Sequence, residues 1–134
     1  MTLEHAALWT NQLERLKQYY EQFFGASAGN KYVNPATGFE SYFLSFGQGA
    51  RLELMQRPRI PANLNDTVEA QHLGFIHLAF GVDSPEEVDQ KARELLAAGW
   101  PILSGPRRTG DGYYEFETLD PDNNRLEVTT AWVD

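Results

Sequence analysis

The chain has 134 residues, a net charge of −8 and no cysteine, so disulfides and thiolate metal sites are excluded and the phosphates of nucleic acids are repelled. Apolar residues make up 42% of the chain, enough for a hydrophobic core, but no stretch approaches the roughly 20 apolar residues of a membrane helix. The first 24 residues carry charges throughout and lack the apolar core of a signal peptide. We therefore expect a cytoplasmic protein that has neither nucleic acid nor a membrane as a partner.

The first half of the sequence combines one helix with short strands. Residues 3–10 read as a strand, and a helix is predicted to follow, with Asn11 as its N-cap, Glu14 at the capping-box position and Gly25 at its end. Apolar side chains recur at helical intervals between these limits. Three short strands are predicted after the helix, at residues 28–33, 40–46 and 50–56.

The second half repeats this plan. Residues 75–82 read as a strand, and the run from Ser84 to Glu87 has the serine cap, first-turn proline and capping-box glutamate of a helix start. Gly99 ends that helix. Strands are predicted at residues 101–103, 113–119 and 125–131, and a turn at residues 120–124.

The spacing of polar residues supports a duplication of a β-α-β-β-β module. His5 precedes Glu53 by 48 positions, and His77 precedes Glu127 by 50. The second helix region is longer by two residues, which accounts for the difference. The sequence therefore predicts one α+β domain over residues 1–134, with module one at about 1–56, a linker at about 57–73 and module two at about 74–134.

Alternation of side chains along the strands places these four polar residues on the sheet face opposite the one that a helix can cover. Glu53, His77 and Glu127 each have apolar neighbours that point the opposite way, toward the face that a helix can cover. His5 shares its side of the strand with Trp9. Burying two carboxylates and two imidazoles needs a partner, and a shared divalent cation satisfies all four. If the face is open to solvent, the same residues are ordinary exposed side chains.

Five segments of the chain carry a family resemblance that spans nearly its whole length. They are residues 3–8, 20–25, 51–55, 74–83 and 120–128, of which the runs His-Leu-Ala-Phe at 77–80 and Asp-Pro-Asp with Leu-Glu at 120–127 are the most specific. The chain resembles the vicinal oxygen chelate superfamily, within it the glyoxalase I-like proteins. This resemblance implies two β-α-β-β-β modules that form a curled mixed-sheet cup, the glyoxalase-like fold.

The resemblance also implies a metal centre. It gives His5, Glu53, His77 and Glu127 as ligands of one divalent ion (Zn, Ni, Fe, Mn or Co), as in glyoxalase I, the lactoylglutathione lyase. In that enzyme the metal holds two adjacent substrate oxygens, and a glutamate moves a proton between neighbouring carbons. Glu127 is the implied catalytic residue, with Glu53 as its counterpart. A homodimer is implied as well, with the site formed within one chain or across the dimer interface.

Other positions bear on the substrate. Glyoxalase I usually carries an arginine at the exit of the first strand, where this chain has Trp9, and an indole cannot hold a glutathione carboxylate. Trp9 then walls a more apolar pocket, or belongs to the core or a dimer interface. Arg51 holds an anionic substrate group or pairs with an acid, and Tyr113 borders the cavity. The basic runs at 57–59 and 107–108 are interpreted as solvated loops in preference to anion sites.

The leading hypothesis is a metal-dependent lyase or isomerase of a small substrate with vicinal oxygens, not linked to glutathione. A non-catalytic small-molecule binding protein of the antibiotic-sequestering kind is the alternative, which the 8 Phe, 6 Tyr and 3 Trp favour and the four ligands oppose. A metal-dependent transferase or dioxygenase of the same superfamily is the other alternative. Such enzymes usually have one carboxylate ligand, so the second glutamate argues against it.

Overall fold

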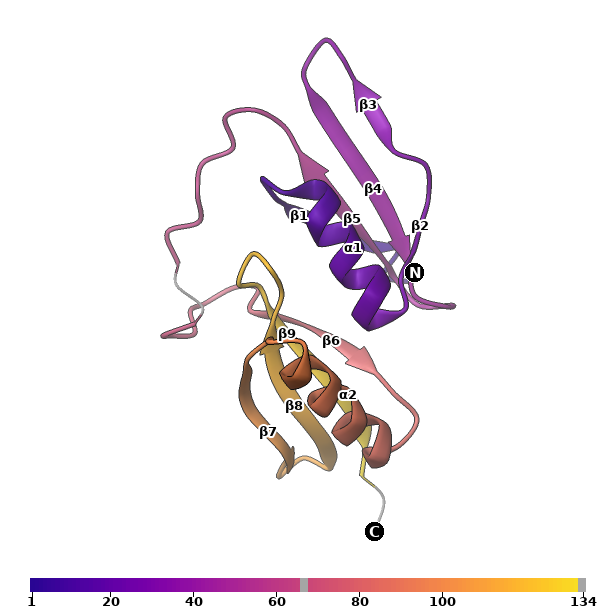
Figure 1. Ribbon diagram of the computed structural model, residues 1–134, viewed down its shortest axis with the longest axis vertical. Helices are drawn as coiled ribbons and strands as arrows, with labels where there is room; N and C mark the ends of the chain where they lie inside the picture. The colour runs from indigo at the N-terminus through magenta and orange to yellow at the C-terminus, as the bar shows by residue number, and fades with distance from the viewer. Residues whose placement is uncertain (66–67, 133–134) are drawn as a thin grey trace. The chain divides into compact units, whose positions relative to one another are not determined.

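The computed structural model describes residues 1–65 and 68–132 (Figure 1). The chain divides into two compact units, Met1–Asn63 and Leu64–Asp134. Each unit contains one helix and one open mixed sheet, which confirms the predicted α+β class with two β-α-β-β-β-like modules. No helix among the described residues is long and apolar enough to cross a membrane.

The first unit has a sheet in the order β1-β5-β4-β2, with β3 paired to β4. Strands β1 and β5 are parallel, and the other neighbours are antiparallel. The predicted strand at residues 28–33 is two short strands, and the others lie close to their predicted positions. The elements are β1 (His5–Trp9), α1 (Leu13–Phe24), β2 (Ser27–Ala28), β3 (Tyr32–Asn34), β4 (Phe39–Ser45) and β5 (Arg51–Gln56).

Helix α1 covers one face of this sheet. Its apolar stripe is buried against alternate residues of β4 and β5. Burial of each large apolar side chain stabilises the folded state by roughly 1.5–3 kcal/mol. Gly25 ends the helix in the left-handed conformation, as predicted, and its N–H donates to the Tyr20 carbonyl. The buried residues of this layer are Leu13, Leu16, Tyr19, Tyr20, Phe23, Leu44, Leu52 and Leu54.

The start of α1 differs from the prediction. Gln12, not Asn11, is the N-cap, and it makes no side-chain capping bond. The Gln56 side-chain oxygen instead accepts a hydrogen bond from the Leu13 N–H at 3.0 Å. The acceptor comes from the end of β5, 43 residues away, so local spacing cannot reveal it.

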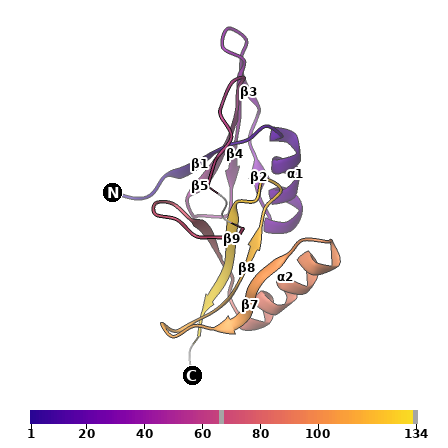
Figure 2. The ribbon, with the colours of Figure 1, turned by 90° about the vertical axis from the view of Figure 1, so that its left-hand side faces the viewer.

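The second unit has a sheet in the order β6-β9-β8-β7, with β6 and β9 parallel. Ser84 caps α2 as predicted and accepts from the Glu87 N–H at 3.3 Å. Figure 2 shows α2 lying along its sheet, where Val88, Ala92 and Leu95 are buried. The elements are β6 (His77–Gly81), α2 (Pro85–Ala97), β7 (Ile102–Arg108), β8 (Tyr113–Leu119) and β9 (Arg125–Ala131).

Strand β7 is longer than the predicted residues 101–103, because it continues through a cis Gly105–Pro106 bond and two register shifts. It lies at the sheet edge, where proline and bulges are tolerated. Arg107 and Arg108 therefore belong to a strand, and the interpretation of this basic run as a loop is wrong. Arg107 pairs with Glu115 at 3.7 Å.

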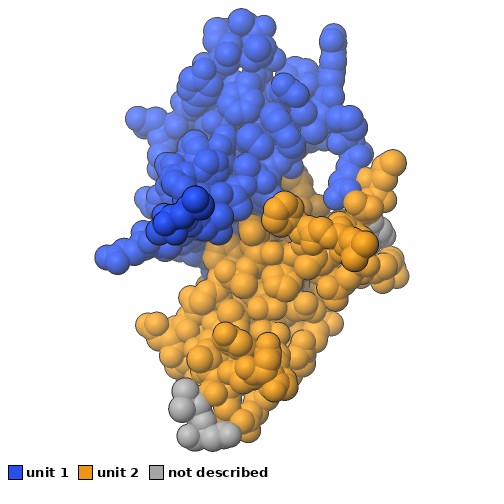
Figure 3. All heavy atoms as spheres, turned by 180° about the vertical axis from the view of Figure 1, so that it is seen from behind, with its two compact units in different colours: residues 1–63 blue, residues 64–134 orange. Residues whose placement is uncertain are grey.

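The segment between the two sheets contains the boundary of the units, at residues 63 and 64 (Figure 3). This boundary falls within the predicted linker at 57–73, of which residues 66–67 lie outside the described part. Leu73 and Phe75 in this segment are fully exposed. The segment thus carries apolar side chains that its own unit does not bury.

The turn between β8 and β9 fixes the start of β9. Asp120 is only 1% exposed, and its carboxylate accepts from the backbone N–H groups of Asp122 and Asn124, both at 2.9 Å, and from the Asn124 amide at 2.8 Å. Asn123 takes the left-handed conformation that such a turn needs. The side chain of Asp120 therefore sets where β9 begins, at Arg125, two residues before Glu127.

We predict that Asp120→Ala lowers the free energy of unfolding by about 2–4 kcal/mol, because three donors at a buried turn lose their acceptor. Urea unfolding followed by circular dichroism measures this. Asp111→Ala, at an exposed turn on the other end of β8, is the control and should change stability by less than about 0.5 kcal/mol. Equal losses in the two variants would contradict the role assigned to Asp120.

Candidate metal centre

The first unit brings His5 and Glu53 together on the sheet face opposite α1. In the parallel register of β1 and β5, His5 pairs with Arg51 and Ala7 with Glu53. The imidazole and the carboxylate thus come from neighbouring strands, two positions apart, and point to the same side. His5 Nε2 lies 3.8 Å from Glu53 Oε2, and the Glu53 side chain is only 15% exposed.

A second carboxylate orients the His5 ring. Glu4 contacts His5 Nδ1 and also accepts from Arg51, whose Nε lies 2.8 Å away. Hydrogen bonds from His5 and from Arg51 hold the pKa of Glu4 below its usual value. With Nδ1 engaged by a carboxylate, Nε2 is the ring nitrogen that faces Glu53, an arrangement common among metal-ligating histidines. Arg51 thus pairs with an acid, Glu4, as one of the two hypotheses expects. Its guanidinium also lies over the Phe43 ring, 4.2 Å from the ring centre.

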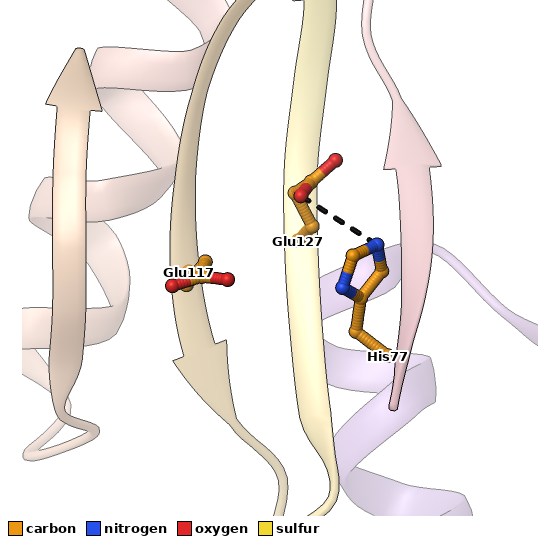
Figure 4. A group of neighbouring side chains, drawn as sticks. All are labelled: His77, Glu117 and Glu127. Atoms are coloured by element: carbon orange, nitrogen blue, oxygen red, sulfur yellow. Dashed lines mark ion pairs between the residues drawn. The ribbon is translucent and has the colours of Figure 1, made fainter. Parts of the chain in front are cut away.

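The second unit repeats the pair and adds a third donor. His77 Nε2 lies 3.7 Å from Glu127 Oε2, and Ala79 pairs with Glu127 across β6 and β9 as Ala7 does with Glu53. Figure 4 shows Glu117 of β8 beside them, and it pairs with Glu127 in the register of β8 and β9. Ligand atoms of His77, Glu117 and Glu127 all lie within 4.8 Å of one another.

Negative charge is concentrated on this face of the second sheet. Burial raises the pKa of Glu127, and the nearby carboxylate of Glu115 raises it further, while His77 opposes the shift. Glu117 is held by Arg125 at 3.4 Å, and Arg125 is itself 9% exposed. The side chain of Glu127 is only 13% exposed. A divalent cation would offset this repulsion.

Glu117 was not among the residues that sequence reasoning singled out. The signal was present, because Glu115 and Glu117 flank the apolar Phe116 and so oppose its face. Comparison of the two halves hid it, since the position that pairs with Glu53 in the first unit is Phe43. A search for equivalent residues in the repeat therefore returns two ligands per module and misses the third carboxylate of the second.

Comparison with known proteins gives the family. Residues 2–128 match the model of the Glyoxalase/Bleomycin resistance protein/Dioxygenase superfamily. The chain belongs to this superfamily. It is 25% identical to the uncharacterized protein YqjT of Bacillus subtilis strain 168 over 129 residues, which cover 94% of this chain and 96% of that protein.

Solved structures of superfamily members share the fold. A glyoxalase family protein from Bacillus cereus is 12% identical, with a TM-score of 0.81 over 99% of this chain and 95% of that one. A lactoylglutathione lyase from Agrobacterium tumefaciens is 25% identical, with a TM-score of 0.68 over 96% of this chain and 92% of the other.

The residues present fit a metal of the kind that the superfamily implies. One imidazole nitrogen and two carboxylates converge in the second unit, and half-buried oxygen and nitrogen donors suit Zn, Ni, Fe, Mn or Co. The first unit offers one imidazole and one carboxylate at a similar separation. His5 and Glu53 thus lie together in one unit and His77 and Glu127 in the other, and their sharing of one ion belongs to the proposal below.

The three residues expected to contact substrate lie at different places. Trp9 ends β1 on the His5 face and is 39% exposed, so it is not part of the core under α1. Its ring contacts Phe39 edge-on at 6.0 Å, and the guanidinium of Arg57 lies 5.1 Å from its centre. Tyr113 is 44% exposed at the start of β8, on the same face as Glu117 but four residues away. Arg51 is engaged by Glu4.

We predict a pH-dependent stabilisation of the metal-free protein by Glu127→Gln. Because the folded state raises the pKa of Glu127 above 4.5, the stability that goes with its protonated form is lost as pH rises through the raised value. The glutamine variant escapes this loss. Urea midpoints measured with a chelator at about pH 4 and pH 7.5 should show the variant gaining on the wild type at the higher pH.

The control for this experiment is Glu86→Gln, an exposed glutamate in the first turn of α2. Its effect on stability should be small and similar at both pH values. If Glu127→Gln shifted the midpoint equally at the two pH values, a raised pKa of Glu127 would not be the cause.

Proposed function

We propose that this protein is a metal-dependent lyase or isomerase of the glyoxalase I type, acting on a small substrate that has two adjacent oxygen atoms and no glutathione. The observation that carries the proposal is the cluster of His77, Glu117 and Glu127 on one sheet face, with donor atoms within 4.8 Å of one another. The pair of His5 and Glu53, 3.8 Å apart at matching register positions, is separate support.

The proposed ligands of the metal are His5, Glu53, His77 and Glu127, from one chain or from two chains of a dimer. When bound, the cation supplies Lewis acidity toward two adjacent substrate oxygens. The Glu4 carboxylate orients His5 by holding Nδ1, so the imidazole does not need to reorganise on loading. Arg51 in turn fixes Glu4 from the neighbouring strand.

Glu127 is the residue proposed to move the proton between neighbouring carbons. Its raised pKa brings its proton affinity closer to that of a general acid–base at neutral pH. Glu53 holds the equivalent register position in the first unit and is its proposed counterpart. Arg125 pairs with Glu117 on the neighbouring strand, so Glu117 is the carboxylate beside Glu127 whose charge is balanced within the second unit.

The substrate is proposed to be more apolar than glutathione at the end of β1. Trp9 and Phe39 form an aromatic surface there on the face that carries His5. An indole offers one N–H donor and no positive charge, so Trp9 itself cannot form a bidentate pair with a carboxylate, and positive charge near it comes from Arg57 after β5. Lactoylglutathione lyase is the activity of the Agrobacterium relative, and we propose a different thiol or acid for this chain.

The assembly is proposed to be a homodimer of single glyoxalase-like domains, each built of residues 1–134. The support on this chain is the pair of fully exposed apolar side chains, Leu73 and Phe75, just before β6. Apolar side chains of this size favour a surface that covers them. A second copy of the chain is the occupant that the family suggests.

A non-catalytic binding module is the second candidate. The observation that favours it is the row of aromatic rings on the first sheet, where Tyr32 contacts Phe39 at 6.0 Å and Phe39 contacts Trp9 at the same distance. Tyr32 is 56% exposed, so a flat ligand can reach it. This candidate requires no metal, which separates it from the leading proposal.

We predict that the purified protein binds about one divalent metal ion per chain. Glu53→Gln and His77→Ala should each weaken the affinity by more than about tenfold, since each removes a proposed ligand. Elemental analysis after purification without added metal, followed by calorimetric titration of the chelated protein, measures both quantities.

Glu94→Gln is the matched control for metal binding. Glu94 lies on α2 and pairs with Lys91 at 2.5 Å, away from the proposed ligands, so its loss should leave the affinity unchanged. Absence of metal binding by the folded wild-type protein would overturn the enzymatic proposal and leave the binding module.

We predict that the metal-loaded protein turns over a 2-oxoaldehyde–thiol adduct or an epimerisable acid. Glu127→Gln should lower kcat by about 10²–10⁴-fold, the usual contribution of a general acid–base. A stopped-flow absorbance screen of such compounds measures the rates. Metal binding without turnover of any compound in either class would contradict the catalytic assignment and keep only the metal site.

A further inference from the structure

An open cavity of about 430 Å³ lies in the first unit beyond the end of β5. Its lining residues are Thr37, Arg57, Pro58 and Arg59. The turn between β3 and β4 forms one side of it. Gly38 of this turn packs so tightly on Pro58 that a Cβ at position 38 would lie 3.0 Å from the proline ring. The Gly38 N–H donates to the Asn34 carbonyl at 2.9 Å, which fixes this turn.

The cavity is cationic although the chain has a net charge of −8. Arg57 and Arg59 form no ion pair with any carboxylate of residues 1–65 and 68–132. Three other arginines, Arg51, Arg107 and Arg125, each pair with a glutamate. Two neighbouring guanidinium groups without a counter-charge repel one another, so their placement in one cavity favours an anion between them.

Trp9 holds the first of these guanidinium groups in place. The guanidinium of Arg57 lies over the indole, 5.1 Å from the ring centre, and the indole is buttressed by Phe39. A guanidinium held over an aromatic ring by a cation–π contact can still donate through the N–H groups that point away from the ring. The fork of Arg57 is therefore oriented before any ligand arrives.

The second arginine lies at a backbone position that disfavours it. Arg59 has a φ of 69°, in the left-handed region, where glycine is at ease and a long side chain is not. Residues in such strained backbone conformations cluster at active sites and ligand-binding sites. Thr37 adds a hydroxyl group: its oxygen accepts from the Phe39 N–H at 3.3 Å, and its own hydrogen remains free to donate.

We propose that this cavity is an oxyanion-binding site, which takes the carboxylate or phosphate group of a small molecule through Arg57, Arg59 and Thr37. The sequence alone favoured a solvated loop at 57–59, and the unpaired, stacked geometry points to the other interpretation. Trp9 places the site on the sheet face that carries His5. Binding of the oxyanion needs no metal, so the site stands independently of the proposed function.

The test is titration of the full-length, chelator-treated protein with inorganic phosphate and, separately, with succinate, followed by NMR of the arginine Nε–Hε groups. The signals of Arg57 and Arg59 should shift and saturate with at least one of the two probes, and the probe that binds more tightly identifies the group. Arg57→Gln and Arg59→Gly should each weaken binding by at least tenfold. Arg59→Gly should also retain or raise the melting temperature, because glycine takes a positive φ freely.

Arg108→Gln is the matched control, since it removes the same charge and a similar contact with an indole, at 4.4 Å from Trp132, outside the cavity. It should leave phosphate and succinate affinities unchanged. Shifts that never saturate with either probe, or an equal loss in Arg108→Gln, would overturn the site. Binding that appears only after metal is added and survives Arg57→Gln would also overturn it, while leaving the metal proposal intact.

Discussion

The parallel pairing of the first and last strands in each unit is the constraint on which the candidate site depends. In β1 with β5, and in β6 with β9, this register sets a histidine two positions from a glutamate on the neighbouring strand and on the same face. The resulting separations are 3.8 and 3.7 Å. Because a shift by one residue would turn every side chain to the other face, the buried leucines under the helix hold the ligands in place. Leu54 and Leu126 are fully buried on that opposite face.

The two units use this common frame for different chemistry. Beside Glu53 the next strand carries Phe43, whereas beside Glu127 it carries Glu117. The first sheet thus has an aromatic face that ends in arginines, and the second has an acidic face with three half-buried glutamates. A metal ligand set is most complete on the second sheet, while the first offers apolar and cationic surface. Duplication supplied the frame, and the residues beside each pair determine what it can bind.

Much of this was accessible to reasoning from the sequence, where the physics is local. Strands β8 and β9 occupy the predicted residues, because alternation around Phe116 and Val128 and the Asp120 turn are short-range signals. The failures share a different cause. The cap of α1 comes from Gln56 in a distant strand, and β7 continues through Gly105 and Pro106 because an edge strand tolerates them. Such features depend on tertiary neighbours and leave no periodic pattern.

Within the site, sequence spacing predicted each histidine–glutamate pair but could not reveal Glu117. Its importance comes from the strand that lies beside Glu127, and pairing of β8 with β9 is a property of the folded sheet. The same holds for Arg57, an exposed residue after β5 whose contact with the indole of Trp9 could not be predicted from the sequence. The behaviour of a charged side chain depends on its burial and on the groups around it, so a basic or acidic residue can be assigned a role only after its neighbours are known.

The histidine–glutamate pairs of the two units also differ in their surroundings. In the first unit Glu4 contacts His5 and Arg51 pairs with Glu4, so the His5 ring is oriented and the charge of Glu4 is balanced without metal. In the second unit burial, together with the nearby carboxylate of Glu115, raises the pKa of Glu127, and a bound cation would offset this cost. Relief of repulsion stabilises the folded state, so metal affinity and the stability of the second unit are coupled. In the proposed function both roles fall to Glu127, because a crowded, partly buried carboxylate with a raised pKa gains from binding either a cation or a proton.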